Sequence, residues 1–353
     1  FLFAIYSAAP HIEGFTANGE ILMVLPATLS AYCLVTGRPL WAGVAASTAM
    51  LIKPSGAGAF LLAIGWLIVV RARLGGWLRL ALGAAIPLSL SALHGAATSG
   101  LWEYAYAVAL FELGVGWGPH TSLLAETIMG WLYTSPVWTP LAPLVALGLT
   151  RLTGRSREFL LLWLLASLAG VAMGGRWYMH YFTQLMPPLA AAAAAGLAHL
   201  WASRSTRIAL GAVTLLAIVF IVLEGPFYLD EPKQGSWRLY HRLGYQIADD
   251  VAAYIRSHTA SNETIYVAFA EADIYHLAQR RSAFPLLFLI HVRYFPGAYN
   301  RLVDTIEARA PTYVLLLDPP MRDTDPEGRF AQALERGYRV ETSFQGVPLY
   351  RRR

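Results

Sequence analysis

Charge and cysteine are both scarce in this chain of 353 residues. Only 14% of the residues are charged and 56% are hydrophobic, whereas a soluble domain averages about 25% charged residues. This composition excludes a disordered chain and argues against an ordinary soluble enzyme. The single cysteine, Cys33, excludes an intrachain disulfide and a cysteine-based zinc site.

Common catalytic and nucleotide motifs are missing as well. The sequence contains no Walker A loop, no GxGxxG, no serine elbow and no HExxH. It therefore shows no site for cytosolic nucleotide chemistry.

What the chain does have is a series of long apolar segments. A spanning helix needs roughly 20 residues, and several segments reach that length only if flanking residues join them. We expect a polytopic α-helical membrane protein with about eight spans. Phe1–Ala9 is apolar without a basic leader, so we expect it to end a helix that starts before Phe1. The apolar segments are residues 20–36, 40–52, 56–70, 77–97, 136–150, 158–175, 183–201 and 207–224.

Basic residues predict the orientation of these spans. Nine arginines fall in alternate connections between the apolar segments, and the opposite connections hold only Lys53 and Arg176. By the positive-inside rule, the connections with nine arginines face the cytoplasm. The net charge of +5 is therefore mostly a topology signal and does not indicate nucleic-acid binding. The nine are Arg38, Arg71, Arg73, Arg79, Arg151, Arg155, Arg157, Arg204 and Arg207.

The composition changes after Glu224, and we predict a transmembrane domain over 1–224 and an extracytoplasmic α/β domain over 225–353. An apolar residue recurs every four positions from Leu239 to Ile255, which predicts an amphipathic helix. We expect strands at 264–269, 312–317 and 338–344, with helices at 301–310 and 327–336. The predicted location is the plasma (inner) membrane, crossed several times.

Ionisable residues at the predicted outer edge of the membrane are the first candidates for function, because charge there is expensive to hold. His11, Glu13, Asn18 and Glu20 precede the first complete apolar segment. Asn18 and Glu20 suit the start of a helix, where a side-chain oxygen or a negative charge is favoured. The carboxylates also suit a base for an acceptor hydroxyl or a metal ligand, with His11 as a further metal candidate. Both interpretations stay open.

The two basic residues on the outer side are candidates for a phosphate contact. Lys53 ends an apolar segment, where it either snorkels or binds an anion. Arg176 and His180 lie four residues apart in an aromatic stretch, so we expect them to share a helix face. The planar guanidinium fork suits phosphate, although the aromatic residues also suit an interfacial belt.

The connection over residues 98–135 has aromatic and acidic residues but no basic one. Trp102, Glu103, Trp117 and His120 in it suit stacking on sugar rings and hydrogen bonding to hydroxyls. They equally suit an interfacial helix lying on the membrane. His120 is also a weak metal candidate, and no metal-ligand spacing is present.

Taken in order, these motifs resemble the dolichyl-phosphate-mannose protein mannosyltransferase superfamily, which has the GT-C fold and includes glycosyltransferase family 39. The resemblance covers residues 1–224. It implies transfer of a sugar from a polyprenyl-phosphate donor to an envelope acceptor (lipid, glycan or protein) at the outer membrane face. The matching stretches are Ala17-Asn18-Gly19-Glu20, Leu51-Ile52-Lys53-Pro54, Gly175-Arg176-Trp177-Tyr178-Met179-His180-Tyr181 and Gln184-Leu185-Met186-Pro187-Pro188.

The resemblance also implies roles for individual residues. Lys53, Arg176, His180 and Tyr181 would hold the donor phosphate. The family's catalytic acid sits in the first outer loop, most of which would precede Phe1, and the usual Asp motif is absent from this chain. In-line attack would invert the anomeric centre, no nucleotide would be needed, and a divalent metal stays open as a cofactor. Glu13 and Glu20 are weaker candidates for the catalytic carboxylate.

Two other functions remain open. A transporter or flippase of polyprenyl-linked sugars would place ionisable groups near the membrane midplane and often shows internal repeats, whereas these charges lie at the outer edge and no repeated half is visible. A non-catalytic envelope scaffold is the other alternative.

Overall fold

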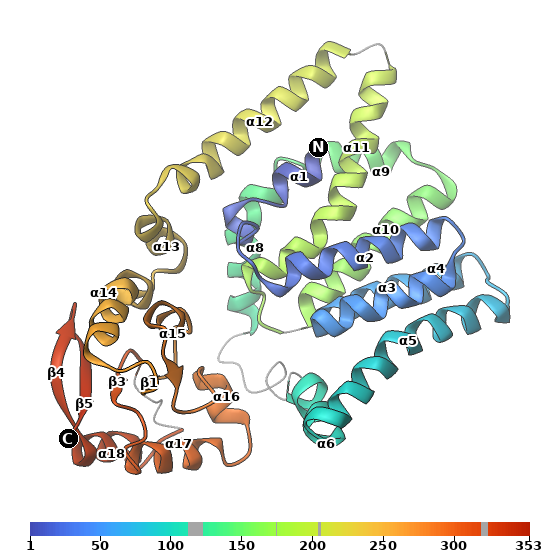
Figure 1. Ribbon diagram of the computed structural model, residues 1–353. Coiled ribbons are helices and arrows are strands. Elements are labelled where there is room, and N and C mark those ends of the chain that lie inside the picture. Colours follow the sequence, from blue (N-terminus) through green and yellow to red (C-terminus); the bar gives the residue numbers. More distant parts are fainter. Residues whose placement is uncertain (112–122, 174, 204–205, 319–323) are drawn as a thin grey trace. The chain divides into compact units, whose positions relative to one another are not determined.

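A computed structural model of the chain shows two compact units, Phe1–Leu229 and Asp230–Arg353, which are described separately (Figure 1). The structure describes residues 1–111, 123–173, 175–203, 206–318 and 324–353. The last helix of the first unit continues to Leu229, five residues beyond the change in composition at Glu224.

The first unit is built from helices, and four of the described ones are long and apolar enough to cross a membrane: Leu74–Thr98, Gly154–Met173, Met179–Ala202 and Thr206–Leu229. Four further apolar helices are shorter. In chain order the elements are α1 (Leu2–Tyr6), η1 (Pro10–Ile12), α2 (Gly19–Val35), α3 (Pro39–Ile52), η2 (Pro54–Ala57), α4 (Gly58–Val69), α5 (Leu74–Thr98), α6 (Leu101–Ala105), η3 (Tyr106–Leu110), α8 (Leu123–Trp138), α9 (Ala142–Arg151), α10 (Gly154–Met173), η4 (Met179–Leu185), α11 (Met186–Ala202) and α12 (Thr206–Leu229).

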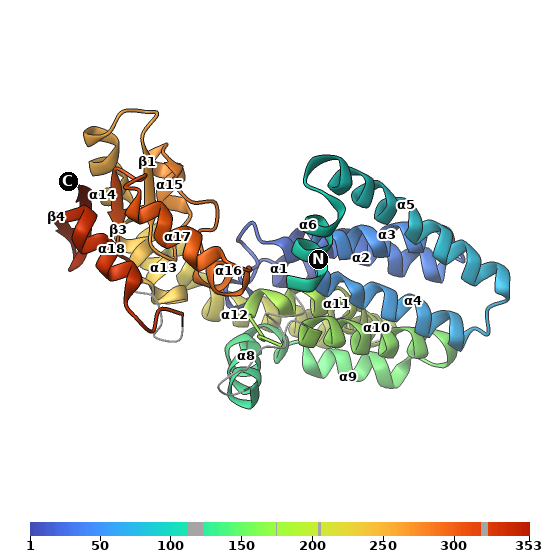
Figure 2. The same cartoon turned by 90° about the horizontal axis from the view of Figure 1, so that it is seen from below.

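Helices of this unit pack closely through small residues. α2 and α3 run side by side, and α3 packs against α5 (Figures 1 and 2). α9 and α11 touch backbone to backbone: a Cβ on Gly148 would lie 2.0 Å from the carbonyl oxygen of Ala192, and one on Gly196 would lie 2.2 Å from that of Leu144. Small residues at such contacts are typical of helices packed in a membrane, where close approach replaces the hydrophobic effect as the source of stability.

The outward faces of the long helices carry large apolar side chains. Leu90 on α5 and Leu215 and Ile221 on α12 are exposed in this unit. Such surfaces suit a hydrocarbon solvent, in agreement with a membrane protein.

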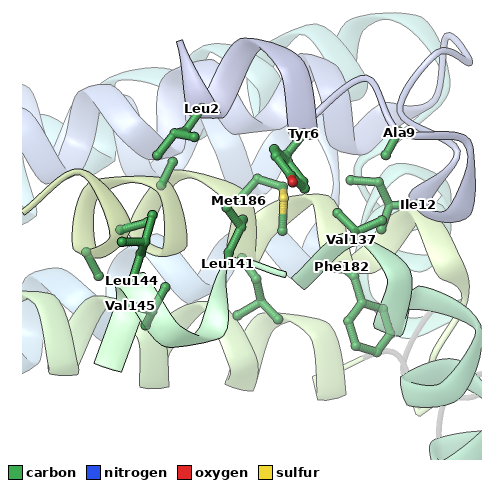
Figure 3. Close-up of a cluster of buried hydrophobic side chains, with 14 of the residues drawn as sticks. Leu2, Tyr6, Ala9, Ile12, Val137, Leu141, Leu144, Val145, Phe182 and Met186 are labelled. Atoms are coloured by element: carbon green, nitrogen blue, oxygen red, sulfur yellow. The ribbon is translucent and has the colours of Figure 1, made fainter. Parts of the chain in front are cut away.

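The N-terminal segment is anchored in a buried apolar cluster. Leu2 and Tyr6 of α1 and Ile12 of η1 lie against residues of α8, α9 and α11 in Figure 3. The Tyr6 hydroxyl also donates a hydrogen bond to the carbonyl oxygen of Leu216 on α12, at 3.1 Å. This anchoring fixes where the polar residues after Ile12 lie.

Three local predictions are wrong. The expected segment 136–150 is divided, because α8 ends at Trp138 and α9 begins at Ala142. The apolar repeat from 239 to 255 is broken at His241, whose left-handed backbone (φ 49°) ends one helix before the next begins. Arg176 and His180 do not share a helix face, because α10 ends at Met173 and η4 begins only at Met179.

The second unit is a small α/β fold around a five-stranded sheet in the order β2-β1-β3-β5-β4. β2, β1 and β3 are parallel, and β5 and β4 continue the sheet as an antiparallel hairpin. Its elements are α13 (Pro232–Tyr240), α14 (Leu243–His258), β1 (Thr264–Val267), α15 (Asp273–Ala278), β2 (Arg281–Ser282), α16 (Leu289–Tyr294), α17 (Ala298–Glu307), β3 (Tyr313–Leu315), α18 (Arg329–Gly337), β4 (Tyr338–Phe344) and β5 (Val347–Arg352).

Sequence patterns did not predict β5. Its hairpin turns at Gln345 and Gly346, which both have positive φ (47° and 87°), as a tight two-residue turn requires. The sheet is covered by two buried clusters, one including Ile247 of α14 and the other Leu302 of α17. Both clusters lie within this unit.

Candidate functional site

A short stretch of the first unit, residues 11–20, forms three ionisable pairs with residues far away in the sequence. Glu13 pairs with His180, Glu20 with Lys53, and His11 with Glu224. The three partners lie at η4, at the end of α3 and on α12. The stretch is therefore fixed to three separate elements, and the pairs gather charge around it.

The first pair joins Glu13 to His180. His180 Nδ1 lies 3.0 Å from Glu13 Oε2, and the two side chains are 20% and 13% exposed. Glu13 has a left-handed backbone (φ 51°), rare for a residue with a Cβ. Its carbonyl oxygen accepts hydrogen bonds from the Thr16 hydroxyl (2.7 Å) and the Asn18 side-chain amide (3.2 Å), which hold this turn in place.

The second pair joins Glu20 to Lys53. The Glu20 side chain is fully buried (0% exposed) and forms an ion pair with Lys53, which is 26% exposed. Among the described residues no other group gives either carboxylate oxygen a hydrogen bond, so Lys53 compensates this charge. The Lys53 ammonium also lies 4.4 Å from the centre of the Tyr181 ring, close enough for a cation–π interaction.

The start of α2 is capped as the sequence predicts. The Asn18 side-chain oxygen accepts a hydrogen bond from the backbone N–H of Ile21 at 3.2 Å, which confirms the prediction of an N-cap. Glu20 lies in the first turn of the same helix. Helix capping and the ion pair with Lys53 are thus separate features of this short stretch.

The third pair involves a residue that sequence reasoning passed over. Glu224 is 1% exposed and accepts from both the ring and the backbone of His11: Oε1 lies 2.8 Å from Nδ1, and Oε2 lies 3.4 Å from the N–H. The sequence did contain a signal for Glu224, which is a lone carboxylate in the apolar run of α12. Ionisable groups inside a membrane segment usually have a role. Glu224 holds the segment just before Glu13.

Arg176 lies in the connection between α10 and η4, in a partly buried position. The next residue, Trp177, has a left-handed backbone (φ 51°), and its ring lies near Trp131 (6.3 Å) and Phe182 (6.2 Å). This turn replaces the expected helix, so Arg176 lies in a bent segment next to packed aromatic rings.

Chain neighbours of the paired residues line an apolar groove of about 520 Å³, and the paired side chains themselves are not among its lining residues. Gly14 directly follows Glu13, and Thr183 lies in η4 three residues after His180; both line the groove. Thr28 and Gln184 line a recess that shares several groove residues, and among the described residues the Thr28 hydroxyl and the Gln184 side-chain nitrogen are buried without a hydrogen-bond partner. The remaining groove residues are Phe3, Ser7, Ala8, Ile21, Val24, Leu25, Trp163, Pro187, Ala190 and Ala191.

The other candidate residues do not join this group. Trp102 and Glu103 lie on α6, which packs against α5, and Trp102 is exposed. Trp117 and His120 lie outside the described residues. Within the described ranges, no group of three or more His, Cys, Asp or Glu side chains could hold a metal ion, and His11 uses its Nδ1 atom in the pair with Glu224.

The second unit has its own acidic group, at the carboxyl ends of β1 and β3. Burial, reinforced by the charge of Asp273, raises the pKa of Glu271 above its usual value. Burial likewise raises the pKa of Asp273. Arg242 lies 3.4 Å from Asp318 and partly offsets this charge. The group affects the pH dependence of this unit's stability.

No known protein-family model and no curated protein matches this chain. The function therefore has to be argued from the residues and their geometry.

Proposed function

We propose that this chain is an integral-membrane glycosyltransferase of the GT-C type, which moves a sugar from a polyprenyl-phosphate donor to an envelope acceptor. The observation that supports it best is that Gly14 and Ile21, which follow the paired residues Glu13 and Glu20 in the chain, line a 520 Å³ apolar groove. A charged group next to an apolar groove suits a ligand with an anionic head and a hydrocarbon tail. A polyprenyl phosphate has this chemistry.

The positions of the basic residues support the same ligand. Lys53 ends α3 with its ammonium over Tyr181, and Tyr181 belongs to η4 together with His180. Arg176 comes just before η4. Lys53 and Arg176 would stabilise the charge that develops on the departing phosphate. Lys53 is already compensated by Glu20, so in this proposal the donor phosphate shares Lys53 with that carboxylate.

The proposed reaction needs no nucleotide, because a sugar on a phosphate is already activated. The acceptor hydroxyl attacks the anomeric carbon in line with the phosphate leaving group, so the anomeric configuration is inverted. A base near the donor removes the hydroxyl proton. The proposed acceptor is a lipid, glycan or protein of the cell envelope.

The proposal includes a topology. About eight spans, formed by α2, α3, α4 with η2, α5, α8 with α9, α10, α11 and α12, would place Glu13, Lys53 and Arg176 on the outer side of the plasma membrane. The bias of nine arginines on one side against Lys53 and Arg176 on the other supports this orientation. The second unit would then be extracytoplasmic.

The experiment is turnover by the full chain in proteoliposomes supplied with radiolabelled polyprenyl-phosphate sugars. The panel varies the sugar, and release of polyprenyl phosphate is measured. We expect turnover of at least one donor, and Arg176→Ala abolishes it while the protein stays folded. Arg157→Ala is the matched control, because Arg157 is exposed near the start of α10, among the arginines of the opposite side.

Three results would contradict the proposal. Movement of the labelled lipid between leaflets without cleavage would indicate a flippase instead. If the unmodified protein turns over no donor, the proposed transferase function is wrong. Normal turnover by Arg176→Ala would exclude Arg176 as a phosphate contact.

A further inference from the structure

We propose that His180 is the base that takes the acceptor's proton, and that Glu13 is the residue that orients it. The proposal rests on the proposed transferase function and assigns a step within it. It replaces the sequence-based role of His180 as a phosphate contact.

The pair's geometry determines which nitrogen of the ring is available. An ionised carboxylate only accepts hydrogen bonds. With Glu13 Oε2 3.0 Å away, Nδ1 of His180 is therefore the ring atom that carries hydrogen. In the neutral ring the acceptor lone pair is then on Nε2. Among the residues that the structure describes, Nε2 has no hydrogen-bond partner.

Burial assigns the two members of the pair to different roles. Glu13 is the more enclosed, at 13% exposed, while the His180 ring is 20% exposed. Tyr178 stacks on that ring (centroids 5.7 Å apart, planes 26° apart), and Tyr181 meets it edge-on at 5.0 Å. The aromatic rings fix the imidazole plane, and the carboxylate fixes its rotation.

The support behind Glu13 comes from two directions. Its left-handed backbone is held by the Thr16 and Asn18 side chains, and two residues earlier His11 is bound to buried Glu224. An orienting residue needs such support, because a small displacement of a catalytic group sharply reduces the rate.

Charge also favours a base over a phosphate contact. When His180 is protonated beside ionised Glu13, the pair has no net charge and attracts an anion poorly. As a proton acceptor the same pair is well suited, because the carboxylate stabilises the imidazolium that forms.

The step balances as follows. The acceptor O–H bond breaks and its proton moves to Nε2 of His180. The acceptor oxygen forms a bond to the anomeric carbon, and the bond from that carbon to the phosphate oxygen breaks. The electron pair leaves on the phosphate, on the side of Lys53, whose ammonium lies over the same Tyr181 ring that contacts His180. No oxidant, reductant or nucleotide is required.

The test uses the full chain in proteoliposomes with the donor that the unmodified protein turns over. His180→Gly should lower kcat by ~10²–10⁴-fold, the usual contribution of a general base, with little change in KM for the donor. Added imidazole should restore part of the lost rate, because the free base can enter the space left by the ring. Exposed His94 on α5 provides the control: His94→Ala should keep full activity and show no response to imidazole.

Glu13→Gln is the second variant, because it keeps the size of the side chain. If its amide nitrogen donates to Nδ1, the hydrogen moves to Nε2 and the acceptor lone pair is lost; if its neutral oxygen accepts from Nδ1–H instead, the negative charge that stabilises the imidazolium is gone. We expect a fall in kcat with unchanged donor KM, and no rescue by imidazole.

The outcomes separate the two proposals. Absence of turnover in the unmodified protein defeats the transferase function, and this step with it. If the unmodified protein turns over donor, then full activity of His180→Gly or of Glu13→Gln overturns the roles proposed for His180 and Glu13. The transferase function would stand. Folded His180→Gly with a raised donor KM and no rescue by imidazole would also overturn the role of His180 as a base. That result would indicate that His180 contacts the donor phosphate.

Discussion

The buried ion pair between Glu20 and Lys53 leads to an asymmetric prediction about stability. Glu20 is fully buried, whereas Lys53 is 26% exposed. Replacing Lys53 by Met therefore leaves a buried carboxylate without its compensating charge, which costs about 3–5 kcal/mol of unfolding free energy. Replacing Glu20 by Gln leaves a partly exposed ammonium that water can solvate, so the loss is smaller, about 1–3 kcal/mol, as for one unsatisfied buried polar group.

The double variant tests the pairing itself. In Glu20→Gln/Lys53→Met neither charge remains, so the double variant should be more stable than Lys53→Met alone. The coupling free energy of the cycle should be about 0.5–3 kcal/mol, the range for contacting residues. It is obtained from unfolding in mixed micelles of increasing SDS content, followed by tryptophan fluorescence and circular dichroism.

The chain offers a natural control, since Lys233 is its one other lysine. Lys233 is 45% exposed and lies 3.8 Å from Asp250 and 3.9 Å from Asp249, both of which are exposed. Exposed pairs contribute about 0–1 kcal/mol, so Lys233→Met should change stability little. The reasoning fails if Lys53→Met costs no more than Lys233→Met, or if the double variant is no more stable than Lys53→Met.

Three further predictions concern packing, pH and topology. Gly148→Val should lower the free energy of unfolding by about 1–3 kcal/mol, because its Cβ would lie 2.0 Å from the carbonyl oxygen of Ala192. An unchanged midpoint of unfolding in SDS would contradict this close contact. Glu271 has a raised pKa in the folded state, so its contribution to stability is complete below its unfolded value and is lost as the pH rises through the folded value. Glu271→Gln should therefore stabilise the second unit at pH 7, measured by hydrogen exchange of strand β1; no gain in protection would refute this. A cysteine replacing Trp117 should react with an impermeant thiol reagent from outside the cell, and labelling only after lysis would reverse the proposed topology.

Several features of the fold follow from local patterns. Apart from the divided segment 136–150, long apolar runs predicted the apolar helices of the first unit, because hydrophobic length does not depend on what a helix packs against. Asn18 was predicted as a helix cap from its side chain and position, and the hydrogen bond to Ile21 confirms it. The strands at Thr264 and Tyr338 were likewise predicted from β-rich apolar runs and lie where expected.

Other features depend on backbone turns that those patterns do not encode. A helical repeat predicted one face for Arg176 and His180, but Trp177, between them, and Gly175, just before Arg176, both have left-handed backbones. His241 interrupts the repeat from 239 to 255 in the same way. A single left-handed residue ends a helix whatever the apolar spacing around it.

By itself the sequence determined the apolar helices, the scarcity of lysine and the set of ionisable residues from which a site must be built. Only the tertiary structure decided the partners: Glu13 with His180 across 167 positions, and His11 with Glu224 across 213. No sequence spacing encodes such contacts, because they depend on how η1, η4 and α12 pack around the residues between them. Burial has the same origin, so the structure alone shows that Glu20 and Glu224 are enclosed. It also shows that Nε2 of His180 has no hydrogen-bond partner among the described residues.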